Sequence, residues 1–64
     1  MKFIAGHRYC SDDKHEMLVV NRFDRTKQIS VEVGFRFPVD YKIYANHEGC
    51  EYIIVEKRIF RASN

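Results

Sequence analysis

The segment from Asp40 to Val55, DYKIYANHEGCEYIIV, constrains the fold most strongly, because it is typical of two strands joined by a short polar turn. Apolar side chains alternate with other residues on both sides of the turn, as Tyr41 and Ile43 do before it. Residues 45–49 form the turn, and they include an Asn and a Gly, which accept left-handed backbone conformations readily. The segment therefore predicts a β-hairpin.

Strand patterns also dominate the rest of the chain. Residues 28–33 alternate strictly, which predicts a strand with one wet face, whereas the run Leu18-Val19-Val20 is apolar on both faces and suits a central strand. Phe3 and Tyr9 are expected to contact the core, and no segment predicts a helix. Short strands at roughly eight-to-twelve-residue spacing predict an all-β fold. We expect five to six short strands in a small antiparallel curled sheet or SH3-like barrel, with an OB-like barrel less favoured.

Length and charge narrow the function classes. A chain of 64 residues suits a single compact β domain spanning residues 1–64. Its net charge is only +2, and its acidic and basic residues are interspersed along the chain. Proteins that mainly hold a nucleic-acid backbone usually carry a stronger positive charge or a clear basic stripe. The opening run of three apolar residues is too short for a signal peptide, and no run approaches the ~20 apolar residues of a membrane span. We expect a cytoplasmic protein.

Two His-x-x-Cys pairs, His7 with Cys10 and His47 with Cys50, supply the four nitrogen and sulfur ligands of a tetrahedral zinc site. In a regular strand, residues i and i+3 face opposite sides, so the first pair could chelate only if the chain turns there. The favoured interpretation is two surface histidines and two semi-buried free cysteines, with a disulfide as the lesser alternative. We therefore expect no cofactor.

Catalytic chemistry has weak sequence support. A cysteine nucleophile needs a histidine base and an orienting group within a pocket, and a domain this small rarely encloses one. The paired carboxylates Asp12 and Asp13 lie in a segment with turn composition and are interpreted as a solvated loop. We expect the protein not to be an enzyme.

The candidate binding surfaces are two basic–aromatic clusters and a group of tyrosines. The first cluster consists of Arg22, Phe23, Arg25 and Lys27, and the second of Lys57, Arg58, Phe60 and Arg61. Cations beside exposed aromatics suit single-stranded nucleic acids, although the favoured interpretation is that Phe23 and Phe60 close the core while the charges solvate its rim. Tyr44 is expected on the face opposite Tyr41, and exposed Tyr near Arg is common at protein interfaces. The candidate binding residues, for protein or nucleic acid, are Arg22, Phe23, Arg25, Lys27, Tyr44, Tyr52, Lys57, Arg58 and Arg61.

Five different short motifs follow one another along the chain: Phe3-x-x-Gly6-x-x-Tyr9, the turn from Val20 to Thr26, Lys42-Ile43, Gly49 to Tyr52, and Ala62. In this order the chain resembles short, uncharacterised β-rich proteins of bacterial phages and mobile elements. It departs from them in the loop after the first strand, where residues 11–15 replace a cysteine-bearing loop, and in a central turn longer by two residues. The resemblance implies a small cytoplasmic accessory protein and transfers no functional residue.

These observations together predict a non-enzymatic binding module, an accessory protein of a phage or mobile element that acts through protein–protein contact. Within this class, inhibition of a host defence system, in the manner of an anti-CRISPR protein, is one expectation. The first alternative is a nucleic-acid-binding β-barrel that uses the basic–aromatic clusters. The second is a zinc-stabilised or homodimeric structural module, since a sheet edge near Pro38 could pair with a second copy.

Overall fold

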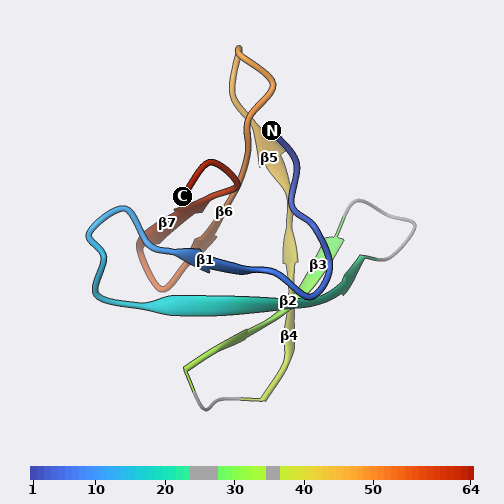
Figure 1. Cartoon of the computed structure of the whole chain (residues 1–64), viewed down its shortest axis with the longest axis vertical. Coiled ribbons are helices and arrows are strands. Elements are labelled where there is room, and N and C mark those ends of the chain that lie inside the picture. The colour runs from blue at the N-terminus through green and yellow to red at the C-terminus, as the bar shows by residue number, and fades with distance from the viewer. Residues whose placement is uncertain (24–27, 35–36) are drawn as a thin grey trace.

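The computed structural model describes residues 1–23, 28–34 and 37–64, with the backbone alone for Arg22 and Phe23. It is all-β and antiparallel, as predicted (Figure 1). These described residues form seven short strands instead of the five or six expected: β1 Arg8–Cys10, β2 Met17–Phe23, β3 Gln28–Val33, β4 Val39–Lys42, β5 Tyr44–Ala45, β6 Glu51–Val55 and β7 Arg58–Arg61.

The strands form two antiparallel sheets, one with the order β1-β2-β3-β4 and one with the order β5-β6-β7. The predicted hairpin strand before the turn is divided at Ile43, so β4 pairs with β3 while β5 pairs with β6. A second connection joins the segment after β1 to β7: Ser11 forms a β-bridge with Phe60, and the Asp12 N–H donates to the Ile59 carbonyl at 2.8 Å. The bent β4–β5 segment and this bridge therefore connect the sheets into a curled β structure around one core.

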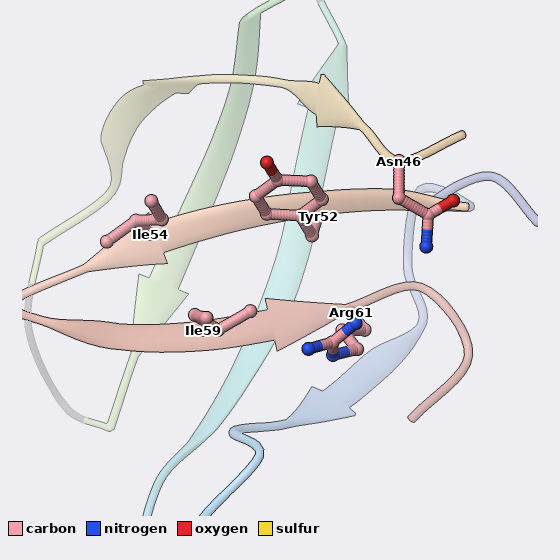
Figure 2. A pocket seen from close by; sticks show the side chains of 5 residues that line it. All are labelled: Asn46, Tyr52, Ile54, Ile59 and Arg61. Carbon is pink, nitrogen blue, oxygen red and sulfur yellow. The ribbon is translucent and has the colours of Figure 1, made fainter. Parts of the chain in front are cut away.

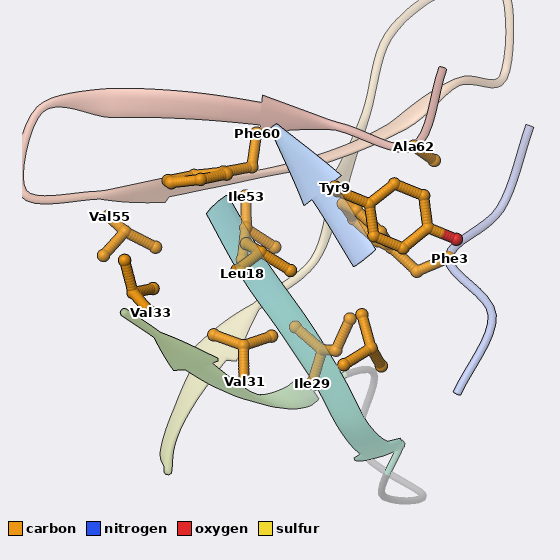
Figure 3. Close-up of a cluster of buried hydrophobic side chains, with 11 residues drawn as sticks. Phe3, Tyr9, Leu18, Ile29, Val31, Val33, Ile53, Val55, Phe60 and Ala62 are labelled. Carbon is orange, nitrogen blue, oxygen red and sulfur yellow. The ribbon is translucent and has the colours of Figure 1, made fainter. Parts of the chain in front are cut away.

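Eleven buried side chains form this core, and they come from both sheets and from the N-terminal segment (Figure 3). Phe3 packs edge-on against Tyr9, with ring centroids 4.9 Å apart, which confirms the prediction that both residues contact the core. The core residues are Phe3, Tyr9, Leu18, Val20, Ile29, Val31, Val33, Ile53, Val55, Phe60 and Ala62.

The predicted alternation holds on the inner side of β3, where Ile29, Val31 and Val33 are all buried. Ser30 was expected on a wet face but is also buried, opposite Asp40 of β4. In β2, Leu18 is fully buried as expected of a central strand. The alternation in residues 28–33 and the apolar run in residues 18–20 therefore located these two strands correctly. The burial of Ser30 was missed because it depends on the neighbouring strand β4.

Two tight turns connect the strands of the smaller sheet. Gly49 closes the β5–β6 turn with φ of +82°, a conformation that glycine adopts without a steric penalty. The β6–β7 turn places Glu56 at φ +49° and Lys57 at φ +69°, so both central residues of a two-residue hairpin are left-handed. Asn and Gly usually fill these positions, so this turn is formed at a backbone cost that the packed strands must overcome.

In the segments that the structure describes, no helix has the length and apolar character needed to cross a membrane.

Candidate functional site

The outer side of the β5–β6–β7 sheet carries a cluster of large side chains that the core does not use. Along β6, Ile53 and Val55 point into the core, so Tyr52 and Ile54, which alternate with them, point outward. The same alternation on β7 buries Phe60 and places its two neighbours outward. We call this surface the outer face, defined by Tyr44, Tyr52, Ile54, Ile59 and Arg61.

Strand register places the outer-face residues in two cross-strand rows. Tyr44 pairs with Tyr52, and Tyr52 pairs in turn with Arg61. Ile54 lies directly opposite Ile59 on the neighbouring strand. Directly opposite side chains in a sheet contact each other, so the outer face is a contiguous aromatic and aliphatic surface.

The two tyrosines are stacked, with ring centroids 5.5 Å apart and planes 22° from parallel. The Lys42 Nζ lies 5.2 Å from the centre of the Tyr44 ring, within the range of a cation–π contact. Each ring is therefore held by a neighbour in the free protein. A partner that binds here would not need to order these side chains, which reduces the entropy lost on association.

An open hollow of about 300 Å³ lies on the outer face, lined by Asn46 in addition to Tyr52, Ile54, Ile59 and Arg61 (Figure 2). Ile54 is 48% exposed and Tyr44 41%, which is unusual for side chains of this size in a strand. The isoleucines supply an apolar floor, while the tyrosine hydroxyl and the guanidinium supply polar groups (Figure 2). The hollow therefore suits a side chain of a partner that is mainly apolar.

Asn46 fixes one end of this hollow because it organises the β5–β6 turn. Its side-chain oxygen Oδ1 accepts hydrogen bonds from the backbone N–H of Glu48 at 2.9 Å and of Cys50 at 3.0 Å. Its backbone N–H donates to the Cys50 carbonyl at 3.0 Å, and its carbonyl accepts from Gly49 N–H at 2.9 Å. The same residue thus closes the turn and contributes to the hollow.

Arg61 is held in place by the segment that follows β1. Its Nε lies 2.9 and 3.1 Å from the two carboxylate oxygens of Asp12. The Asn64 side-chain amide donates to the same carboxylate at 2.9 Å and to the Cys10 carbonyl at 3.1 Å. Asp12, which is not part of the outer face, thus holds Arg61 at one side of it.

A second carboxylate–arginine contact lies beside the first. The Arg58 Nε donates to Asp13 at 3.0 Å, the His15 backbone N–H donates to the same carboxylate at 3.1 Å, and the Ser11 hydroxyl donates to it as well. The buried Ser11 oxygen also accepts from the Glu16 N–H at 3.1 Å. These contacts attach the segment after β1 to β7. Asp12 and Asp13 lie in an exposed turn, as the sequence predicted, and each also pairs with an arginine of β7.

Hydrogen bonds from these donors stabilise the ionised carboxylates. The Asn64 amide, followed by Arg61, lowers the pKa of Asp12 below its usual value. The Ser11 hydroxyl, then the His15 N–H and Arg58, lower the pKa of Asp13 strongly. Both carboxylates are therefore charged at neutral pH, and each compensates the charge of an arginine.

These contacts change the interpretation of the second basic–aromatic cluster. Arg58 and Arg61 already pair with carboxylates, and Phe60 is completely buried, so it cannot stack on a base. Lys57 is exposed in the β6–β7 turn. The structure thus confirms that Phe60 closes the core. In the first cluster, Arg25, Lys27 and the side chains of Arg22 and Phe23 lie outside the described residues.

The predicted zinc ligands are not brought together. Cys10 lies on β1, and the His47 side chain at the tip of the β5–β6 turn is 90% exposed and 3.7 Å from Glu48. Cys10 and Cys50 are free cysteines. His7, Cys10, His47 and Cys50 all belong to the described part of the chain, and within that part no three His, Cys, Asp or Glu side chains form a group that could hold a metal ion. The arrangement required for the tetrahedral site is therefore absent from the described residues.

Sequence reasoning found part of the outer face and missed the rest. Tyr44, Tyr52 and Arg61 were predicted as binding residues, and the structure places all three in one row across three strands. Ile54 and Ile59 were missed, because an apolar residue in a strand is usually assigned to the core. The available signal was that Ile54 lies between two other apolar residues of β6, which cannot all face the same side.

Comparison of the chain with protein-family models, with curated proteins and with solved structures found no match. We therefore infer the function from the geometry of the outer face and from the chemistry of its residues.

Proposed function

We propose that this protein is a non-enzymatic binding module that docks onto a protein partner through the outer face. The observation that carries the proposal is the stacked Tyr44–Tyr52 pair beside Arg61 and the Ile54–Ile59 pair, all on one side of a three-stranded sheet. Tyrosine and arginine are the residues that most often dominate binding energy in protein interfaces. Side chains of this kind on the solvent side of a small domain favour a docking role over a stabilising one.

The size of the molecule fits this role. A standard interface buries about 800 Å² on each partner, and the whole protein exposes 4780 Å². An interface of that size would take about one sixth of this surface, with the outer face at its centre and the turn at Asn46 extending it. The packed tyrosines and the paired Arg61 give a partly rigid surface, so most of the interaction energy would appear as affinity.

Charge indicates the chemistry of the partner. Lys42 lies next to the Tyr44 ring on one side of the outer face, and Arg61 lies on the other side. The five residues that define the outer face include no carboxylate, and Asp12 compensates the charge of Arg61, so Lys42 supplies the positive charge beside this surface. We therefore expect the partner to present an apolar segment with an acidic residue beside it.

A displayed library of random peptides tests this proposal. Selection on the immobilised protein should enrich apolar sequences that carry Asp or Glu, and Ile54→Ala should weaken binding of the selected peptides about tenfold. Ile4→Ala is the matched control, because Ile4 is 52% exposed but is not one of the residues that form the outer face. Equal weakening by both substitutions, or no enrichment at all, would reject the outer face as the docking surface.

Inhibition of a host defence nuclease and an origin in a phage or mobile element stay predictions of the sequence. An inhibitor of this kind needs only a surface complementary to the nuclease, and the outer face is our candidate for that surface. A direct test is to measure cleavage of target DNA by a purified defence nuclease with and without the protein. If inhibition occurs, Ile54→Ala should weaken it and Ile4→Ala should not.

A further inference from the structure

Strand β4 forms one edge of the four-stranded sheet; it is short, follows Pro38 and carries the charged side chains Asp40 and Lys42. Short length, a proline and charges restrict which strands can pair with such an edge. Strand β4 pairs with β3 on one side, and no second strand pairs with it among the described residues. Phe37 is 89% exposed just before the strand, and Val39 at its start is 49% exposed. Natural proteins normally protect edge strands because unpaired backbone groups recruit further strands. An accessible edge beside exposed apolar side chains suits strand pairing.

The charges on β4 show which strand would fit. Asp40 and Lys42 are both exposed and two residues apart, so they lie on the same side of the strand. Within the part of the chain that the structure describes, Asp40 takes part in no ion pair. In an antiparallel pair of two β4 strands centred on Tyr41, each Asp40 lies directly opposite the Lys42 of the other strand. The sequence of β4 is therefore complementary to itself in this register.

We propose that two copies of this chain associate through their β4 strands, antiparallel about a two-fold axis at Tyr41. The two four-stranded sheets then join edge to edge, with two Asp40–Lys42 pairs on one side of the new sheet. Val39 of one copy lies opposite Ile43 of the other, which covers one of the exposed apolar residues. A two-fold axis at Asp40 instead of Tyr41 would place Asp40 opposite Asp40, and the repulsion between the two carboxylates disfavours that register.

The position of Lys42 is compatible with this pairing. Its ammonium group lies 5.2 Å from the centre of the Tyr44 ring, and an ammonium group has three N–H donors. The ring occupies one side of the group, and a carboxylate can approach from another. The outer face lies on the other sheet, so the dimer would present two copies of it. The inference does not depend on the proposed function, because self-association is measured without any partner.

Charge exchange at β4 provides the test. Sedimentation of the wild-type protein over a range of concentrations should show a monomer–dimer equilibrium. Asp40→Lys places Lys opposite Lys, and Lys42→Asp places Asp opposite Asp, so each variant alone should associate about thirty-fold more weakly. An equimolar mixture of the two variants restores opposite charges at both positions, and it should form a heterodimer as readily as the wild type forms a homodimer.

Glu48→Lys controls for net charge, because this exposed residue of the β5–β6 turn lies away from β4 and the substitution makes the same charge change as Asp40→Lys. This variant should dimerise like the wild type. A wild-type protein that stays monomeric at all concentrations would overturn the proposal. So would a dimer that both β4 variants leave intact, or a mixture of the variants that fails to associate.

Discussion

The division of β6 into an inner and an outer side can be tested with two neighbouring isoleucines. Ile53 is completely buried between the two sheets, whereas Ile54 is 48% exposed and lines the hollow on the outer face. Replacing each by Ala removes the same atoms from positions one residue apart on the same strand. The two substitutions therefore differ almost entirely in the side of the sheet that they affect.

The structure gives the expected magnitudes. Ile53→Ala removes fully buried methyl and methylene groups and leaves a cavity, which typically costs 2–5 kcal/mol, or about 3 kcal/mol here. Ile54→Ala loses only about half of the burial of an isoleucine and leaves no closed cavity, so it should cost about 1 kcal/mol. For a domain of this size a change of 1 kcal/mol shifts the Tm by roughly 4–8 °C.

Urea unfolding followed by circular dichroism measures both costs. A chain of this length is expected to have a free energy of unfolding of about 3–10 kcal/mol, so Ile53→Ala should be severely destabilised and Ile54→Ala should stay folded. Equal losses, or a greater loss for Ile54→Ala, would mean that β6 presents its other side to the solvent. The outer face would then not exist as described.

Three further outcomes follow from the polar contacts and the turns. Hydrogen bonds lower the pKa of Asp12 and Asp13 in the folded state, so the two ionised carboxylates stabilise the fold fully above the ordinary pKa of 3.8, and this stabilisation is lost as the pH falls through the lowered values. The Tm should therefore decrease between about pH 6 and 2. Asp13→Asn should make this decrease smaller. Asn46→Ala should lower the free energy of unfolding by about 1 kcal/mol, whereas Asn46→Asp keeps the acceptor and should lower it less. Lys57→Gly should raise the Tm, since it relieves a left-handed residue by about 1 kcal/mol, and an unchanged or lower Tm would contradict this reading of the β6–β7 turn.

The strands could be predicted from the sequence because their signals are local. The alternation in residues 28–33 and the polar residues at 45–49 each depend on a short window, and the structure has a strand and a turn at these places. The exposure of Tyr44 opposite the partly buried Tyr41 was also predicted and is confirmed. Alternation of apolar and polar residues indicates which side of a strand is buried, and neighbouring residues are enough to show it.

What the sequence could not supply depends on contacts between distant residues. The break at Ile43, which divides one predicted strand between two sheets, follows from how the sheets pack and has no local signal. The pairing of Asp12 with Arg61 joins residues 49 positions apart, and Asp13 and Arg58 are 45 apart. Composition showed both signs of charge in the chain, but only the fold determines which charges meet. The basic cluster near the C-terminus was consequently predicted as a binding surface, although two of its cations are already paired.

The most direct test of the central claim is an NMR titration of the isotope-labelled protein with a peptide selected on it. The account predicts that the backbone amide signals of Tyr44, Tyr52, Ile54 and Ile59 shift most, with much smaller changes for Leu18 and Val31 in the other sheet. Shifts that concentrate on the four-stranded sheet, or that spread over the whole chain without a maximum on the outer face, would contradict it.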